Sequence, residues 1–269
     1  MDLDSANFVA MGDDIRIYIK DFIKELEEAL QIRLVCGRQA HVVTLYTEVP
    51  QFSLFIYLPV SGGRIPSAPH RTFHVDYDQL RHERKKICLR LAALLGKGGV
   101  VYARQTVAVR IEKKVAHAFL AEHHLQAPIT GKYRYGLFHQ GELVSIAVFS
   151  GGRHMRDKAE TYRSFELLRF CHKSGLRVVG GLSKLISAFV SEFQPDDIMT
   201  YVDRDWSQES NLQTLGFENR GETAPQRYWI TDEGRTAIKS EQHLHELMNM
   251  APGGYLRSNC GSLKLVLPL

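Results

Sequence analysis

The sequence RVVGGLSKLISAFVSEF at residues 177–193 is followed by DDIMTYVDRDWS at 196–207 and NLQTLGF at 211–217. A glycine pair opens an amphipathic segment, whose apolar residues recur with helical spacing. The second segment is typical of an apolar strand that ends in charged and aromatic residues, and the third of a short helix that ends at a glycine. A strand that turns through glycines into a helix exposes backbone N–H groups, which suit an anion such as a pyrophosphate. The stretch therefore predicts a mixed α/β fold with a binding site at the glycine turn.

The predicted anion site lies where a central strand enters the helix. Glycine lets a ligand approach the backbone closely, and the first helical turn carries partial positive charge. A serine in this turn is a candidate helix cap and the lysine after it adds a charge. We expect the binding residues to be Arg177, Val179, Gly180, Gly181, Ser183 and Lys184. An ordinary strand-to-helix turn, with a glycine for geometry and a serine cap, is the alternative.

The first 99 residues predict a small α-β-β-α domain. Apolar residues spaced along 13–30 indicate an amphipathic helix, and 41–47 and 53–59 are rich in strand formers. Residues 61–70 form a loop pattern, and a helix containing the basic segment 81–90 stops at glycines. We interpret the basic segment as the solvated face of a packed helix, with a phosphate-facing helix as the alternative.

A second domain is predicted over residues 100–235, followed by an extension over 236–269. Its pattern is β-α-β-β-β-α-β-α-β-β, beginning with VVYARQTVAVRI as one strand and including a hairpin around residues 139–142. The extension contains a helical piece and a terminal strand, SLKLVLPL. The whole is an α+β fold, a mixed sheet with helices on its faces.

Composition predicts a globular, cytoplasmic protein. Hydrophobic residues make up 44% and charged residues 24%, and no apolar run approaches the ~20 residues that span a bilayer. The N-terminal stretch is acidic and has no signal-peptide pattern. Four scattered cysteines indicate reduced core thiols rather than disulfides or a metal site. A formal net charge of +4 is compatible with a polyanionic ligand or nucleic acid.

The segments around the glycine turn resemble the GNAT acyltransferase superfamily. Its pyrophosphate loop follows Gln/Arg-x-x-Gly-x-Gly/Ala, which Arg177 and Gly180 match, while Leu182 occupies a position where a small residue is usual. The family also ends a short helix in Leu-Gly-Phe, as at residues 215–217, commonly with a tyrosine three residues earlier, where this chain has Leu212. The resemblance implies acetyl-CoA or another acyl-CoA as donor, in a cleft beside the glycine turn.

A narrower resemblance covers residues 100–231 and concerns the Mom-like branch of that superfamily, which occurs in phage DNA-modification proteins and in modules that accompany phage and homing nucleases. The matching segments, in order, are HLQ at 124–126, the YGLF…GELV hairpin, FSGGR, YRSFELLRF, VVGGLSKL, TYVDRDWS, LGF and RYW. This resemblance implies a GNAT-like fold and transfer of a group to a base amine, with DNA as partner.

The reacting end of the predicted cleft contains Asp203, Tyr201 and His124. A carboxylate at a strand end can accept a proton from an amine nucleophile, directly or through water. An ion pair of Asp203 with Arg204 or Arg169 is the structural alternative. For His124, the alternative is a favourable position at a helix C-terminus. Metal binding by these side chains has no support from ligand spacing.

Glu166 is a further catalytic candidate, because GNAT enzymes often place a general base on this strand. Strict alternation along 164–172 groups Glu166 with Leu168 and Phe170 on one face, and puts Arg169 on the other. Apolar neighbours on this face would raise the pKa of the Glu166 carboxyl, as a general base needs. The alternative is that Glu166 is a buried carboxylate held in a structural ion pair. The remaining candidates bind the acceptor, and they are Gln126, Arg153, Arg204, Trp206 and Trp229.

Two other functions are alternatives to a group transferase. A non-catalytic nucleic-acid-binding module would use the same cleft, and a small-molecule N-acetyltransferase would share the fold. A restriction-type nuclease needs Glu-x-Lys on a strand, but the match at residues 83–85 falls in a helix pattern, so we reject it. Recognition or dimerisation remains for residues 1–99.

Overall fold

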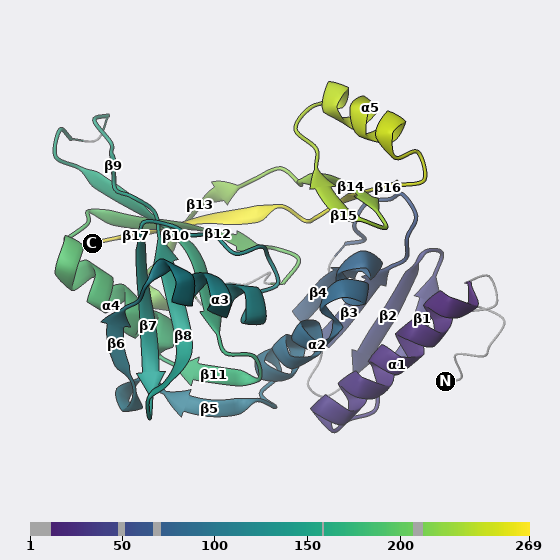
Figure 1. The fold of residues 1–269 in the computed structure, drawn as a ribbon, viewed down its shortest axis with the longest axis horizontal. Helices are drawn as coiled ribbons and strands as arrows, with labels where there is room; N and C mark the ends of the chain where they lie inside the picture. The colour runs from purple at the N-terminus through teal and green to yellow at the C-terminus, as the bar shows by residue number, and fades with distance from the viewer. Residues whose placement is uncertain (1–11, 48–51, 67–70, 158, 207–211) are drawn as a thin grey trace. The chain divides into compact units, whose positions relative to one another are not determined.

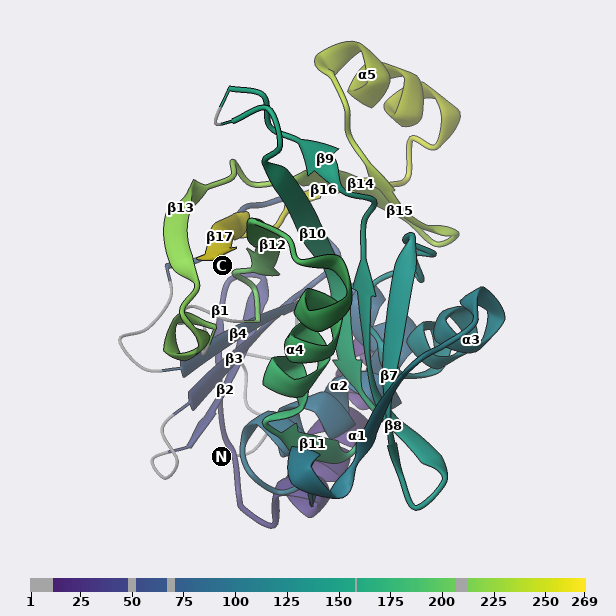
Figure 2. The ribbon, with the colours of Figure 1, turned by 90° about the vertical axis from the view of Figure 1, so that its left-hand side faces the viewer.

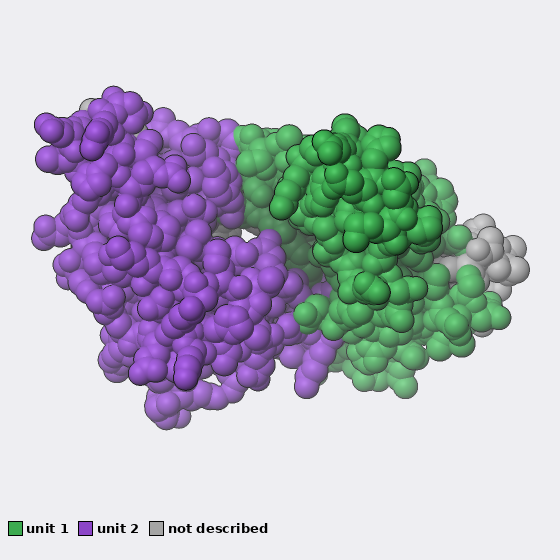
Figure 3. All heavy atoms as spheres, turned by 45° about the horizontal axis from the view of Figure 1, so that its top comes forward, with its two compact units in different colours: residues 1–84, 202–210, 222–263 green, residues 85–201, 211–221, 264–269 purple. Residues whose placement is uncertain are grey.

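The computed structural model describes residues 12–47, 52–66, 71–157, 159–206 and 212–269. The chain divides into two compact units, neither of which is one continuous stretch (Figure 3). Unit 1 contains residues 1–84, 202–210 and 222–263, and unit 2 contains 85–201, 211–221 and 264–269. This division differs from the predicted domain boundaries after residues 99 and 235. The predicted C-terminal extension contributes to both units, up to residue 263 to unit 1 and from 264 to unit 2.

Unit 1 begins with a helix and a sheet in the order β1-β2-β3-β4, in which only β3 and β4 are parallel. The elements are α1 (Asp13–Leu30), β1 (Val35–Gln39), β2 (Val42–Thr47), β3 (Phe52–Tyr57) and β4 (Arg71–Asp76). The predicted α-β-β-α order is therefore wrong, since β1 and β4 were missed. The polar residues Thr72, His74 and Asp76 of β4 are buried, so the strand carries no apolar signal.

The rest of unit 1 comes from both ends of the chain. Its elements are α2 (Tyr77–Leu94, of which the part up to Arg84 belongs here), β14 (Arg227–Thr231), β15 (Gly234–Ala237), α5 (Glu241–Met250) and β16 (Tyr255–Ser258). α2 is kinked at Glu83, where φ is −126° and ψ is 23°. The order β15-β14-β16 gives a second, antiparallel sheet, in which β15 and β16 were not predicted. Residues 83–85 lie in α2, as their helical pattern indicates.

A buried network of ion pairs joins these segments within unit 1. Asp76, 1% exposed, lies 2.5 Å from Arg64 Nη1 and 2.9 Å from Arg235 Nη2. Arg64 also reaches Asp205, at 2.8 Å, and Arg235 reaches Asp78, at 2.8 Å. The arginines hold the pKa of the Asp76 carboxyl below its usual value despite burial, which by itself raises it. The network therefore ties the end of β4 to residues far along the chain.

Acidification from pH 6.5 to about 4 is expected to destabilise the protein through His74. This imidazole is fully buried, 2.8 Å from the Tyr57 hydroxyl, and burial lowers its pKa from 6.5 to about 4. Between these values the unfolded chain binds a proton that the folded chain does not. The free energy of unfolding therefore decreases as the pH is lowered, by roughly 1–3 kcal/mol. Urea unfolding at pH 7 and 4.5 measures the difference.

His74→Gln keeps an acceptor for Tyr57 but does not titrate, so its unfolding should depend less on pH over this window. His82→Gln, at an exposed position of α2, is the matched control and should behave like the wild type. Equal pH dependence in all three proteins would contradict the role of His74.

Unit 2 is built on a mixed eight-stranded sheet whose main path is β13-β17-β12-β10-β8-β7-β6. Its strands are β6 (Val107–Arg110), β7 (Tyr133–His139), β8 (Glu142–Phe149), β9 (Arg153–His154), β10 (Arg163–His172), β12 (Asp197–Asp203), β13 (Glu218–Glu222) and β17 (Ser262–Pro268). The predicted fold class, a mixed sheet with helices on its faces, is confirmed (Figure 1). Within the described residues, no helix is long and apolar enough to cross a membrane.

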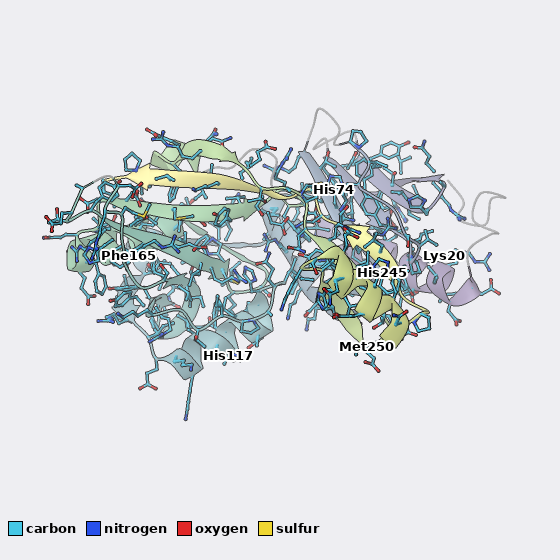
Figure 4. All side chains as sticks on the ribbon, turned by 90° about the horizontal axis from the view of Figure 1, so that it is seen from above. Lys20, His74, His117, Phe165, His245 and Met250 are labelled. Atoms are coloured by element: carbon cyan, nitrogen blue, oxygen red, sulfur yellow. The ribbon has the colours of Figure 1, made fainter. Side chains whose placement is uncertain are left out.

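Two helices cover opposite faces of this sheet (Figure 2). α3 (Lys113–His123) packs its Phe119 and Leu120 on Ile146 and Val148 of β8. α4 (Gly181–Phe193) packs on the other face, where Phe189 stacks on Phe149 with ring centroids 4.0 Å apart. Figure 4 labels Phe165 of β10, which contacts Phe189 edge-on, and His117 of α3. We call these the α3 face and the α4 face.

The predicted single strand VVYARQTVAVRI is broken. β5 (Gly99–Tyr102) pairs with β11 (Leu176–Val179) in a separate two-stranded sheet, whereas β6 pairs with β7. A 3-10 turn over Ala103–Gln105 separates β5 from β6. The sequence predicts that the strand before the glycine turn, β11, belongs to the central sheet. That prediction is wrong, because β11 pairs with β5 in the separate sheet.

Candidate functional site

The central strands β10 and β12 of unit 2 run parallel and then part. They pair at Ser164↔Asp197, Phe165↔Ile198 and Glu166↔Met199, and no pairing follows. Thr200 Oγ1 donates to the Leu167 carbonyl, at 2.9 Å, where the separation begins. From Leu167 to His172, β10 pairs only with β8 within the described chain. The edge of β10 that faces β12 therefore offers backbone donors and acceptors to another molecule.

A bulge in β10 corrects the predicted faces of this strand. Leu167 pairs with Phe149 and Arg169 with Val148, which leaves Leu168 as the extra residue. Because Val148 belongs to the core under α3, Arg169 lies on the α3 face, and Phe170 lies on the α4 face. Glu166 also lies on the α3 face, so it shares that face with Arg169 and not with Phe170.

The glycine turn opens α4 as predicted, but no side chain caps the helix. Gly180 is the N-cap residue, with φ +76°, a conformation that favours glycine. A Cβ on Gly181 would lie 3.1 Å from Val178 Cβ, so this position also favours glycine. Ser183 is the third helical residue and makes no cap hydrogen bond. The first turn keeps backbone N–H groups that suit an anion.

The charged residues of the predicted cofactor loop have different surroundings. Arg177 and Val179, on β11, are exposed beside the turn. The Lys184 ammonium donates to the Ala103 and Thr106 carbonyls and so holds the turn between β5 and β6. Leu182 is half-buried in the first turn of α4. Arg177, rather than Lys184, is therefore the cation that this loop presents to solvent.

A pocket of about 410 Å³ follows α4 from its first turn. It is lined by α4, by the 3-10 turn at Leu215 and by the end of the chain around β17, which is the neighbour of β12 in the sheet. Its lining alternates hydroxyl and apolar groups, from Ser183, Ile186, Ser187, Val190, Ser191, Leu215, Leu267 and Leu269. Leu267 and Leu269 were not predicted as site residues, because the terminal strand has an ordinary core pattern.

His124 follows α3 and has the properties of a neutral hydrogen-bonding group. The Gln126 backbone N–H donates to its Nδ1, at 3.0 Å, which leaves Nε2 as the protonated nitrogen. Burial, with Arg90 and Arg169 nearby, lowers the pKa of this imidazole to about 3. The structure therefore favours a role in which the His124 imidazole donates a hydrogen bond from Nε2 or positions a substrate, over the predicted role of general base.

The predicted catalytic groups of β10 and β12 lie on the α3 face. Glu166 is opposite Met199, and alternation along β12 puts Tyr201 on the same side. Tyr201 is 45% exposed, while Glu166 is half-buried and its backbone is fixed by two hydrogen bonds to Ser150, each 2.9 Å long. The exposed Gln126 and Arg153 belong to the same unit.

Four of the predicted residues belong to unit 1. Asp203 ends β12 and accepts from the Asp205 backbone N–H at 2.9 Å. Arg204 forms an ion pair with Glu222, at 2.5 Å. Its partner is therefore Glu222, whereas the sequence suggested Asp203 as the alternative. Trp206 packs on Phe73, with ring centroids 5.8 Å apart, and is 9% exposed. Trp229 is 6% exposed, and its indole N–H donates to the Ala251 carbonyl. Both indoles are core groups of unit 1.

Two further segments belong to the predicted site. Residues 207–211, in the predicted helix over 207–215, lie outside the described residues, and Gln213–Leu215 form a 3-10 turn. Leu212, where the resemblance leads one to expect tyrosine, accepts from the Leu215 backbone N–H at 2.9 Å. In the described part of the chain, no three His, Cys, Asp or Glu residues are grouped to hold a metal ion.

No protein-family model matches this chain, and no curated protein is significantly similar to it in sequence. Several solved structures are similar in fold. One, from Corynebacterium glutamicum, is described as histone acetyltransferase HPA2 and related acetyltransferase (10% identity, 61% of this chain and 97% of that chain, TM-score 0.39).

A second is the ribosomal-protein-S18-alanine N-acetyltransferase of Escherichia coli (12% identity, 61% of this chain, 93% of that chain, TM-score 0.39). A third is a GNAT family acetyltransferase from Elizabethkingia anophelis with acetyl-CoA bound (9% identity, 61% of this chain, 99% of that chain, TM-score 0.36). At these scores the likeness to the three structures is distant.

Proposed function

We propose that the chain is an acyl-CoA-dependent N-acyltransferase. The observation that carries this proposal is the edge of β10 after Leu167, along which β12 no longer pairs with it. The pantetheine arm of coenzyme A contains two amides separated by short hydrocarbon segments. Such an arm hydrogen-bonds to a strand edge as a further strand would.

The surroundings of this edge suit the rest of an acyl-CoA. The uncapped first turn of α4 suits a pyrophosphate, with Arg177 exposed beside it. The pocket along α4 has the volume of a small-ligand site, and its serine hydroxyls and aliphatic side chains match a chain of amides and methylenes. The resemblance of the glycine loop to a pyrophosphate loop supports the same assignment.

The proposed chemistry is attack of an acceptor amine on the thioester carbonyl. The amine nitrogen forms the new C–N bond and the C–S bond breaks, so one proton must leave the amine and one must reach the thiolate. Glu166, on the α3 face at the point where the strands separate, is the proposed base. Tyr201, on the same face, is the proposed proton donor.

For the acceptor, we propose an amine on a DNA base. The support is the resemblance of residues 100–231 to Mom-like proteins, in the order and spacing of its segments. Mass spectrometry of nucleosides from cells that express the chain tests it, and a modified base is expected. Unmodified DNA, together with acyl-CoA binding, would favour a small-molecule amine instead.

Acyl-CoA binding itself is tested by isothermal titration calorimetry with acetyl-CoA. Wild type is expected to bind, and Ser187→Trp is expected to weaken binding at least about 10-fold, because an indole fills the pocket along α4. The control is Lys114→Trp, at an exposed position of α3 on the opposite face, which should bind like the wild type. DNA binding by a wild type that binds no acyl-CoA would instead indicate a non-catalytic module.

A further inference from the structure

The two-stranded sheet of β5 and β11 presents an exposed outer face beside the glycine turn (Figure 1). Its parallel register pairs Val100 with Arg177, and Tyr102 with Val179, so these four side chains lie on one face. All four are exposed, the Tyr102 side chain among them at 46%, and the residues between them on each strand are buried on the other face. The face adjoins the glycine turn, because Gly180 directly follows Val179.

Arg104, in the 3-10 turn after β5, adds a second cation to this region. Its guanidinium carbon lies over the Tyr102 ring, 5.0 Å from the ring centroid. Arg104 and Arg177 are both exposed, and neither forms an ion pair with any residue that the structure describes. The two stretches of chain that contain them, 85–111 and 167–191, have no aspartate or glutamate. The region therefore carries positive charge and no acid of its own strands.

Contacts hold the turn that carries Arg104 against the first turn of α4. The Lys184 ammonium, from α4, donates to the Ala103 carbonyl at 2.8 Å and to the Thr106 carbonyl. A Cβ on Gly180 would lie 3.5 Å from the Ala103 Cβ, so the 3-10 turn and the glycine turn are neighbours. All of these residues belong to unit 2. Arg104 is therefore anchored beside the backbone N–H groups that suit a pyrophosphate.

Coenzyme A carries two further recognition groups next to its pyrophosphate. The pyrophosphate is attached to the 5′ position of a ribose, which also bears a phosphate monoester at its 3′ position and an adenine. A phosphate monoester has a charge of about −1.5 to −2 at pH 7, and arginine binds it through paired hydrogen bonds. An exposed aromatic ring with a guanidinium beside it stacks a base. An arginine and a tyrosine beside a pyrophosphate site match these two groups.

We propose that Tyr102 and Arg104 bind the 3′-phosphoadenosine end of the acyl donor, with Arg104 on the 3′-phosphate and Tyr102 against the adenine. This rests on the proposed acyltransferase function, because it takes the first turn of α4 as the pyrophosphate site. A nucleic-acid strand fits less well, since two cations on a small sheet do not form the row that successive phosphates need. The donor is then a full coenzyme A thioester and not an acyl group on phosphopantetheine alone.

The test compares coenzyme A with 3′-dephospho-coenzyme A by isothermal titration calorimetry on the full chain. Wild type is expected to bind coenzyme A about 10- to 100-fold more tightly than the dephospho form. Arg104→Gln is expected to weaken coenzyme A binding about 10-fold or more and to leave the dephospho form within about twofold, since only the 3′-phosphate loses a partner. Tyr102→Ala is expected to weaken both ligands alike, at least about 5-fold, because both contain adenine.

Arg156→Gln is the matched control. Arg156 is an exposed arginine that follows β9, and β9 pairs with the first two residues of β10, whereas the chain leaves the other end of β10 for β11. This variant should bind both ligands like the wild type. Because Tyr102, Arg104 and Arg156 are all exposed, the variants should also unfold at the temperature of the wild type.

Two outcomes would overturn the proposal and leave the acyltransferase function standing. One is a wild type that binds coenzyme A and its dephospho form equally. The other is an Arg104→Gln variant that weakens both equally, since the arginine would then act on the shared pyrophosphate. Tighter binding of a fluorescently labelled single-stranded DNA 12-mer than of coenzyme A, lost in Arg104→Gln, would show a nucleic-acid surface instead. A wild type that binds neither form of coenzyme A would contradict the acyltransferase function and this proposal together.

Discussion

Glu166→Gln is expected to lower the rate of acyl transfer about 100-fold or more and to leave acetyl-CoA binding near that of the wild type. The carboxylate is the proposed base, and a positioned base contributes roughly 10²–10⁴ to a rate. The amide has the same shape but does not accept the amine proton. The backbone of Glu166 is fixed by Ser150, so the substitution leaves the pairing of β10 unchanged.

The measurement is single-turnover transfer at several pH values, with calorimetry for donor binding. A base with this role gives an acid limb in the pH–rate profile, and the variant should lack that limb. Glu122→Gln is the matched control, since this carboxylate is on α3 and its side chain is 76% exposed. A variant rate within threefold of wild type, with the limb retained, would remove Glu166 from the mechanism.

Asp76→Ala is expected to reduce the free energy of unfolding by about 3–5 kcal/mol. The carboxylate is the shared partner of Arg64 and Arg235, and the Arg257 side chain, fully buried, lies 3.8 Å away. Removing it leaves several guanidinium groups without this compensation inside unit 1. Breaking a buried ion pair from one side has a cost of this size.

Urea unfolding at pH 7 measures this loss, and Asp232→Ala is the control. Asp232 also pairs with an arginine, Arg81 at 3.2 Å, but its side chain is 97% exposed, so its loss should cost about 0–1 kcal/mol. Asp76→Asn keeps the volume and removes the charge, and should resemble Asp76→Ala. Equal costs for Asp76→Ala and Asp232→Ala would show that the buried network does not stabilise unit 1.

Helices were the part of the fold that the sequence predicted best. The apolar spacing in residues 13–30 gave α1 with its exact bounds, because a helix buries every third or fourth residue. β4 was missed for the opposite reason, since its Thr72, His74 and Asp76 are polar and buried. Their burial depends on partners such as Tyr57, Arg64 and Arg235, which are far away in the sequence.

In the candidate site, the glycine turn was predicted because its signal is local. Gly180 adopts the left-handed backbone conformation that glycine favours, and α4 begins at the next residue. The predicted face of Glu166 failed at Leu168, because a bulge is a property of strand pairing and leaves no trace in residue alternation. The same bulge moves Arg169 to the α3 face.

The amino-acid sequence alone determined the mixed α/β class, the glycine turn before α4 and the carboxylate on β10, since each depends on neighbours within a few residues. Tertiary structure decided that β10 and β12 part after Glu166, that Lys184 holds a turn, and that side chains of β5 and β11 share one face. Those properties depend on register and on backbone groups that only the folded chain brings together.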